Sequence, residues 1–335
     1  KLQRIFAEGD FTATYKFALL IALADLAIEC GADDGCELVL NTRQIGERFI
    51  ALYWKHGLPY STCLPGCSPG VLTQNKGAQA AVVTAIASFR ATCPTNSLQV
   101  AASLPSYQQL VSAITRTVSA QPLNFLQNFG GGADEFIFER TGTGRIRLKP
   151  GVTYCLRRFY PLVHQLARAH WVDHIKRNER NKSMLGSTDD LEAFLFASSR
   201  QSLEVMAKAL RKLDNGTCFY CEGAVTTADV DHYIPFSLYS RDLAHNFVLS
   251  HPACNRSKSD TLAALLHLER WLGRLDSKRD ALAEIGETAG FQTDVILSRQ
   301  VGAWAYANAF SAGGKAWIAP KTYAPIDHKY TACFS

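Results

Sequence analysis

The 335-residue sequence has no apolar run long enough to cross a lipid bilayer. Its longest apolar stretch, residues 17–28 (FALLIALADLAI), is interrupted by Asp25 and is shorter than the roughly 20 residues that a membrane-spanning helix requires. The opening residues also lack the basic region, the long apolar region and the small-residue cleavage site of a secretory signal. We therefore expect a cytoplasmic protein that does not contact a membrane.

A strong net charge, low-complexity tracts and internal repeats are absent as well. The 35 Lys and Arg residues stand against 30 Asp and Glu residues, which gives a formal charge of +5, and 47% of the residues are hydrophobic. This composition can bury hydrophobic cores, so disordered and fibrous proteins are excluded. At roughly 150 residues per domain, the length predicts about two domains, or one large and one small domain.

Cysteine is too sparse for a disulfide-stapled secreted module, because ten cysteines are spread unevenly over the chain. Three of them share one short stretch with His and Asn residues, and there we expect the chemistry. The other seven are expected to be buried free thiols, since cysteine is among the most buried residue types. Of these seven, Cys63 and Cys67 could instead hold a metal, although three residues separate them and no partner pair lies nearby.

The hydrophobic pattern predicts an α+β fold whose N-terminal region is mostly helical. Apolar residues recur at helical spacing in residues 12–28, 42–54, 78–89, 107–118, 189–213 and 261–275. The first two segments read as amphipathic helices, the second with a cap at Asn41 or Thr42. Two alternating runs in residues 135–149, joined by Thr-Gly-Thr-Gly, predict a β-hairpin. Several helices followed by such a hairpin are similar in topology to a winged-helix arrangement.

Residues 140–182 are strongly basic. Eleven Lys and Arg residues stand there against two acidic residues, a net charge of +9, and four aromatic residues are interleaved with them. The segment therefore predicts contact with the phosphate backbone of a nucleic acid, through Arg157, Arg158, Lys176 and Arg177 in particular. The alternative is a solvated helix face without a partner.

Two short pairs of metal-binding residues lie about thirty residues apart. Cys218 and Cys221 have the two-residue spacing that lets one turn direct two thiolates at a single Zn²⁺, and His251 and Cys254 repeat that spacing. Together they make a Cys₃His set with no vacant position, which is typical of a structural zinc site. The alternative is two unrelated short-range pairs.

The residues around these pairs form a second pattern: Asp229-Val-Asp231-His232-Tyr-Ile-Pro, then Asn246-Phe-Val-Leu, then Cys254-Asn255-Arg-Ser-Lys258. Residues 218–260 resemble an HNH endonuclease domain of the ββα-metal type. The strings DVDH and NRSKSD also resemble the HNH domain of RNA-guided DNA nucleases. The resemblance covers about 45 of the 335 residues. It implies a DNA endonuclease that leaves 5′-phosphate and 3′-hydroxyl ends, of the kind found in bacterial restriction and anti-phage defence.

The residue types fit this chemistry on their own. His232 can take a proton from water at neutral pH, so it is the expected general base. Asp231 and Asn255 are hard oxygen donors that suit a catalytic Mg²⁺ or Mn²⁺, with Asp229 in reserve. Neighbouring residues of a strand point to opposite faces, so Asp231 and His232 can share a site only if a bulge or bend separates them. Lys258, one turn after Asn255, could touch a phosphate.

The resemblance implies further roles and boundaries. It implies that the His232 ring is held by a backbone hydrogen bond and that Asn246 fixes the adjoining loop. His251 stands where the usual domain has another cysteine, and imidazole serves zinc equally well. Arg256 is expected at the nucleic acid, and His245 and His267 are expected to be structural. We divide the chain into a helical domain (1–125), a hairpin and basic segment (126–185), the nuclease domain (186–275, core 218–260) and a C-terminal helical and mixed segment (276–335).

Two functions remain open at this point. The first is an endonuclease acting on double-stranded DNA in preference to single strands. The second is a non-catalytic, zinc-stabilised nucleic-acid-binding module of a larger complex. A single ββα-metal site cuts one strand, so double-strand cleavage would need two copies or two visits, and a homodimer or a regulatory partner protein is expected. The roughly 200 residues before the nuclease include Tyr15-Lys-Phe-Ala-Leu-Leu, Tyr53-Trp54 and Gln74-Asn-Lys-Gly. With these residues the segment resembles the N-terminal part of bacterial HNH proteins.

Overall fold

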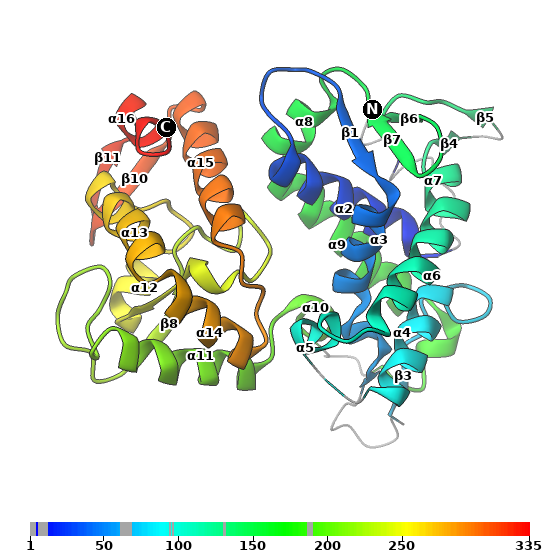
Figure 1. Cartoon of the computed structure of the whole chain (residues 1–335), viewed down its shortest axis with the longest axis horizontal. Helices are drawn as coiled ribbons and strands as arrows, with labels where there is room; N and C mark the ends of the chain where they lie inside the picture. The colour runs from blue at the N-terminus through cyan, green and yellow to red at the C-terminus, as the bar shows by residue number, and fades with distance from the viewer. Residues whose placement is uncertain are drawn as a thin grey trace. The chain divides into compact units, whose positions relative to one another are not determined.

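A computed structural model describes residues 5, 13–60, 69–93, 95, 97–129, 132–185 and 190–335 (Figure 1). The chain forms two compact units, unit 1 (Lys1–Ala197) and unit 2 (Ser198–Ser335). In both units helices combine with short antiparallel strands, which confirms the α+β class. The finer division into four segments stays a prediction. Cys63 and Cys67 lie outside the described residues.

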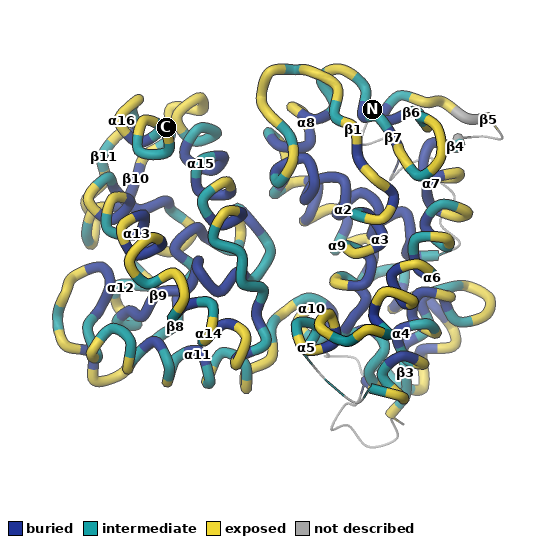
Figure 2. The backbone as a smooth tube through the Cα atoms, viewed as in Figure 1, coloured by how far each residue is buried: buried dark blue, intermediate teal, exposed yellow. Residues whose placement is uncertain are grey.

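Unit 1 is built around helix α2 (Tyr15–Cys30), every residue of which from Tyr15 to Ile28 is buried (Figure 2). The sequence predicted an amphipathic helix here, and this is wrong because α2 is enclosed on all sides. Helices α3 (Thr42–Tyr53), α8 (Val152–Arg158) and α9 (Tyr160–Lys176) pack against it. Even Asp25 is buried, and its carboxylate accepts a hydrogen bond from the Tyr160 hydroxyl at 2.8 Å.

Helix α3 begins at a capping box formed by Asn41, one of the two residues predicted as its cap. The Arg43 amide donates to the Asn41 side chain at 2.8 Å, and the Asn41 amide donates to the Gln44 side chain at 2.9 Å. One face of α3 is buried and the other is exposed, which confirms the amphipathic pattern. Helices α4 (Ala81–Thr92) and α6 (Tyr107–Ala120) pack with it, close to their predicted bounds.

The predicted hairpin is present in unit 1 as β6 (Phe138–Arg140) and β7 (Arg145–Leu148). Strand β1 (Leu38–Asn41), which lies between α2 and α3 in the chain, pairs with β7 and completes an antiparallel sheet in the order β1–β7–β6. The remaining elements of the unit are short: η1 (Lys55–Gly57), β2 (Pro59–Tyr60), β3 (Gly70–Val71), α5 (Leu98–Ala102), α7 (Pro122–Phe125), β4 (Asn128–Phe129), β5 (Gly132–Ala133), η2 (Glu179–Asn181) and α10 (Leu191–Phe196).

The long helix predicted over residues 189–213 is two helices, α10 at the end of unit 1 and α11 (Arg200–Leu213) at the start of unit 2. Ala197 is extended and Ser199 caps a new helix, because its hydroxyl accepts from the Ser202 amide at 3.0 Å. The break in the helix coincides with the border between the two units.

Unit 2 has a two-stranded hairpin at its centre, β8 (Asp229–His232) and β9 (Phe247–Ser250), with the turn η3 (Ala244–Asn246) before β9. Val230, Phe247 and Leu249 join a core formed with α11 and with α14 (Arg279–Ala289). Helix α12 (Pro252–Lys258) follows β9 directly. The other elements are α13 (Leu265–Ser277), α15 (Val295–Ser311), β10 (Lys315–Ala319), β11 (Thr322–Pro325) and α16 (His328–Ala332).

Five of the seven cysteines expected to be buried lie in the described residues, and none of these five is buried. Cys30, Cys36 and Cys155 are exposed, and Cys93 and Cys333 are half-buried. The prediction is wrong for them because several stand at the ends of elements: Cys30 ends α2 and Cys93 follows α4. In the described part of the chain, no helix combines the length and the apolar character needed to cross a membrane.

Candidate metal centre and the His232 site

Two turns bring the four metal-binding residues together. Cys218 and Cys221 lie in a tight turn after α11, in which the Cys218 amide donates to the Gly223 carbonyl at 2.9 Å and the Glu222 amide donates to the Cys218 carbonyl at 3.0 Å. Glu222 takes a left-handed conformation there, with φ of 60°. His251 is the N-cap residue of α12, and Cys254 lies in the first turn of that helix. Both residues therefore follow directly after β9.

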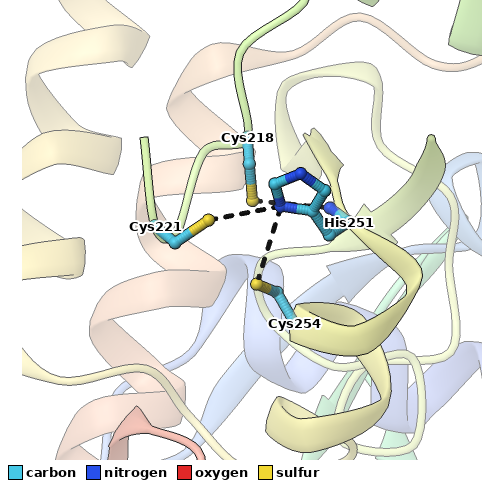
Figure 3. A group of neighbouring side chains, drawn as sticks. All are labelled: Cys218, Cys221, His251 and Cys254. Atoms are coloured by element: carbon cyan, nitrogen blue, oxygen red, sulfur yellow. Dashed lines mark hydrogen bonds between the residues drawn. The ribbon is translucent and has the colours of Figure 1, made fainter. Parts of the chain in front are cut away.

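The ligand atoms of Cys218, Cys221, His251 and Cys254 all lie within 4.8 Å of one another. Figure 3 shows the sulfur atoms gathered around the imidazole, whose Nδ1 is 3.2 Å from Cys221 Sγ and 4.0 Å from Cys254 Sγ. The other ring nitrogen, Nε2, is 3.0 Å from the Ala224 carbonyl and donates to it, which leaves the lone pair of Nδ1 directed at the thiolates. This Cys₃His cluster could hold a structural metal such as zinc.

Strand β8 presents its residues alternately. Asp231 pairs with Val248 and His232 pairs with Phe247 in an uninterrupted antiparallel register. The bulge expected between Asp231 and His232 is therefore not formed in the strand. Their side chains leave β8 on opposite faces, because successive residues of a regular strand do so.

On one face, the Asp231 carboxylate is taken up inside the protein. Its Oδ2 accepts a hydrogen bond from the Tyr220 hydroxyl at 2.5 Å and lies 3.1 Å from Lys258 Nζ. Lys258 is fully buried and also donates to the His232 and Ser259 carbonyls. Burial lowers the pKa of Lys258, and the Asp231 charge opposes that shift. From the sequence we predicted that Asp231 would be an open metal ligand and that Lys258 would contact a phosphate. The structure instead places the two side chains in an internal ion pair.

The same face carries Asp229, which the sequence analysis named as an alternative ligand for the catalytic cation. The Asn255 amide nitrogen donates to Asp229 Oδ2 at 3.2 Å, and both residues are half-buried. Carboxylate and carboxamide oxygens are the donors that Mg²⁺ and Mn²⁺ prefer. By this chemistry, Asp229 and Asn255 fit a divalent cation better than Asp231, whose charge Lys258 already balances.

On the opposite face, the His232 ring meets a carboxylate that sequence reasoning missed. His232 Nε2 lies 2.6 Å from Asp242 Oδ1, and 21% of the His232 side chain stays exposed. An ionised carboxylate only accepts hydrogen bonds, so Nε2 carries a proton, and in the neutral ring the lone pair is on Nδ1. The ring also lies against Phe236 and Phe247. The resemblance implied a backbone partner for this ring, and the structure supplies Asp242 in that place.

Asp242 could have been found only by a weak signal, an acidic residue in the loop four positions before Asn246. Its second oxygen accepts a hydrogen bond from the Ser198 hydroxyl. Among the described residues, no hydrogen bond joins the His232 ring to Asp231 or Asn255. The site is thus a pair, His232 and Asp242, with the oxygen donors on the other side of the strand.

Asn246 holds the chain directly after His232. Its amide nitrogen donates to the Ile234 carbonyl at 2.9 Å, and its side-chain oxygen accepts from the Ile234 amide at 2.8 Å. The Asn246 carbonyl accepts from the Tyr233 amide at 2.7 Å. Because Asn246 is 2% exposed, water does not compete for these bonds, and the turn that follows His232 is fixed.

The remaining histidines expected to be structural are buried, and each is held by one carbonyl. His245 Nε2 lies 3.1 Å from the Arg279 carbonyl, and His267 Nε2 lies 3.0 Å from the Ile318 carbonyl. Burial lowers the pKa of both imidazoles, which favours their neutral form at neutral pH.

The predicted nucleic-acid contacts differ in availability. Arg157 is buried, pairs with Asp33 and donates to three carbonyls at the end of α2, so it stabilises unit 1 from inside. Arg158 is half-buried, whereas Lys176 and Arg177 are exposed at the end of α9, where Arg177 pairs with Asp173. Arg256 is exposed on α12.

Comparison of the chain with protein-family models, with curated proteins and with solved structures gives no match. The functional argument therefore depends on the geometry of the site and on its chemistry.

Proposed function

We propose that unit 2 is a zinc-stabilised HNH-type endonuclease that hydrolyses phosphodiester bonds of DNA, with His232 as the general base. The observation that carries the proposal is the His232–Asp242 pair at the end of β8. An imidazole that is partly exposed and oriented by a carboxylate is more than a structural zinc module requires. The HNH resemblance also suggests a biological role in bacterial restriction or anti-phage defence.

Asp242 supports this role through the tautomer of the ring. By accepting from Nε2–H, it leaves Nδ1 free to take a proton from water, and its negative charge stabilises the imidazolium that results. Asn246 then acts as a positioning residue, because its clamp on Ile234 sets the turn after His232. Phe236 and Phe247 restrict the plane of the ring.

A divalent cation fits the oxygen donors of Asp229 and Asn255 in kind, with Asp231 beside them. When bound, Mg²⁺ or Mn²⁺ would neutralise charge that builds on the phosphate during hydrolysis. Asp229 begins β8 and His232 ends it on the opposite face, so the substrate would have to bridge the two ends of the strand for the cation and the base to act on one phosphodiester. The proposal requires the substrate to bind in this way.

A plasmid-nicking assay with added Mg²⁺ tests the proposal. His232→Ala should lower the rate of cleavage by about 10²–10⁴-fold, the range expected for loss of a general base. The matched control is His328→Ala, which removes an exposed imidazole from the same unit and should leave the rate unchanged. Equal cutting by wild type and His232→Ala would reject the assignment of the base.

The second candidate is a non-catalytic, zinc-stabilised nucleic-acid-binding module. The observation that favours it is the internal Asp231–Lys258 pair, which uses one expected metal ligand for stability. This function predicts DNA binding that does not depend on Mg²⁺ and no nicking by the wild-type chain. The same assay, with a binding measurement beside it, therefore separates the two functions.

A further inference from the structure

We propose that unit 1 binds duplex DNA through the outer face of α6 and the adjoining β6–β7 hairpin. This α6–hairpin face is defined by Gln109, Ser112, Arg116, Arg140 and Arg145. The proposal extends the proposed function, because DNA held by unit 1 would be the substrate that unit 2 cuts. It concerns binding alone, so it can fail or succeed independently of cleavage.

The connectivity of unit 1 supports the proposal. The chain runs from α2 through β1 to α3, and later from α6 to the β6–β7 hairpin, and the sheet has the order β1–β7–β6 (Figure 1). Apart from α7, β4 and β5, which lie between α6 and the β6–β7 hairpin, this is the order of a winged helix, whose last long helix before the hairpin enters the major groove. The segment 54–106 is inserted between α3 and α6, yet these two helices still pack directly on each other.

Helix α6 has one apolar face and one polar face. Leu110, Val111, Ile114 and Val118 are buried against unit 1. The opposite side exposes Gln109, Ser112 and Arg116, which lie within one 100° arc of the helix. Gln, Ser and Arg are the side chains that hydrogen-bond to base edges in the major groove of B-form DNA, and that groove is wide enough for an α-helix.

The charge of this face is suited to phosphates. Arg116 and Arg145 are exposed, and in the described parts of the chain neither forms an ion pair. Arg140 donates to the Ser119 carbonyl, which ties the hairpin to the last turn of α6. An Arg–phosphate contact needs a guanidinium with donors to spare, and these three arginines supply them.

Three acidic residues of the region are paired with other cations. Glu47 pairs with Arg43 on α3, and Arg147 pairs with both Glu37 and Glu139. These pairs leave Arg116, Arg140 and Arg145 without an acidic partner among the described residues. The three arginines border a polar helix face.

The hairpin loop is tight, and it is held at the start of α3, where the Thr42 amide donates to the Gly144 carbonyl at 2.9 Å. Gly142 and Gly144 have φ values of 66° and 76°, a left-handed conformation that favours glycine, and they make the turn between β6 and β7 tight. Gly142 and Thr143 are exposed at its tip. A tight loop next to a helix can follow the backbone that flanks the groove which the helix occupies.

The test measures binding of the full chain to a mixed-sequence DNA duplex of about three helical turns, by fluorescence anisotropy without added divalent cations. Arg116→Ala/Arg145→Ala should raise the Kd at least tenfold. It should also lower the slope of log K against log salt concentration by about two, because each phosphate contact contributes roughly 0.9. Gln109→Ala should weaken binding with little change in that slope.

The rival variant is Lys176→Ala/Arg177→Ala, which removes two exposed cations from the end of α9. If this variant lowers the slope and Arg116→Ala/Arg145→Ala does not, the α6–hairpin face is rejected in favour of α9. An RNA duplex of the same sequence is the second comparison, since its deep and narrow major groove excludes a helix. Equal or tighter binding of RNA would overturn the proposal. DNA binding without cleavage would leave it intact and reject the proposed function instead.

Discussion

On one face of β8, the Asp231 carboxylate lies between the Tyr220 hydroxyl and the fully buried Lys258 ammonium. On the other face, His232 keeps 21% of its side chain exposed and meets Asp242. Both are pairs of charged or titratable side chains on neighbouring residues of one strand. Only the second pair has a surface from which a substrate could reach it.

The difference follows from what covers each face. Helix α12 closes the Asp231 side and brings Lys258 into it, so the two charges are satisfied by each other, by the Tyr220 hydroxyl and by nearby carbonyls. His232 stands at the last position of β8, at the edge of the core that Phe247 and Leu249 form with α11 and α14. We therefore expect changes in the buried Asp231–Lys258 pair to alter stability and changes in the His232–Asp242 pair to alter activity.

The largest expected effect lies outside both faces, in the metal cluster that holds α12 beneath β8. Cys221→Ser, or a chelator applied to the wild-type chain, should abolish the cooperative thermal unfolding of unit 2, since a structural zinc contributes on the order of 10 kcal/mol to folding. Circular dichroism during heating measures this. Cys333→Ser, in the same unit but away from the cluster, should melt like the wild type. An unchanged melting curve for Cys221→Ser would contradict a structural metal.

The next effect is expected from the buried pair. Lys258→Met should lower the free energy of unfolding of unit 2 by about 3–5 kcal/mol, because it leaves the Asp231 charge buried without a partner. Denaturant unfolding gives the value. Arg256→Met, an exposed change on the same helix, should stay within about 0.5 kcal/mol of the wild type. Adding Asp231→Asn to Lys258→Met should restore part of the lost free energy of unfolding. If Lys258→Met alone costs less than about 1 kcal/mol, the pair is not closed to water.

A smaller effect is expected from Asn246, which connects the two faces through the turn after His232. Asn246→Ala should cost about 2–3 kcal/mol, because the amide and the carbonyl of Ile234 both lose a buried partner. Hydrogen exchange at the Ile234 amide should become faster. Gln201→Ala removes an exposed carboxamide from α11 and serves as the control. Wild-type exchange at Ile234 in Asn246→Ala would rule out the clamp.

The smallest effect on stability, and the sharpest test of the comparison, is expected from Asp242→Asn. The pair with His232 is partly exposed, so the free energy of unfolding should fall by less than about 1 kcal/mol. Nicking should nevertheless slow by about 10²-fold or more, because an amide does not hold the required tautomer of the ring or stabilise imidazolium. Glu284→Gln, an exposed change on α14, controls for loss of one negative charge. If stability falls strongly and nicking does not, Asp242 is a structural residue.

Local patterns in the sequence were sufficient for several elements. The cap at Asn41 and the Thr-Gly-Thr-Gly turn each depend on residues close together in the chain, and both are found as predicted. The same holds for the two pairs of metal-binding residues, whose spacing brings each pair to one turn. Local patterns failed where the environment decides: α2 is surrounded by other helices, and Arg157 is turned inward to Asp33.

The amino-acid order by itself determined the two short pairs of metal-binding residues and the placement of Asp231 and His232 on one strand, because both are matters of short spacing and of strand alternation. Only the tertiary structure decided which of those two side chains is enclosed and which stays accessible. Lys258 lies far along the chain from Asp231, and Asp242 lies in the loop that follows His232. Whether these partners meet depends on how α12 and the loop before Asn246 pack on β8. The free energy of burying a charge is set by those distant neighbours, and no local pattern specifies them.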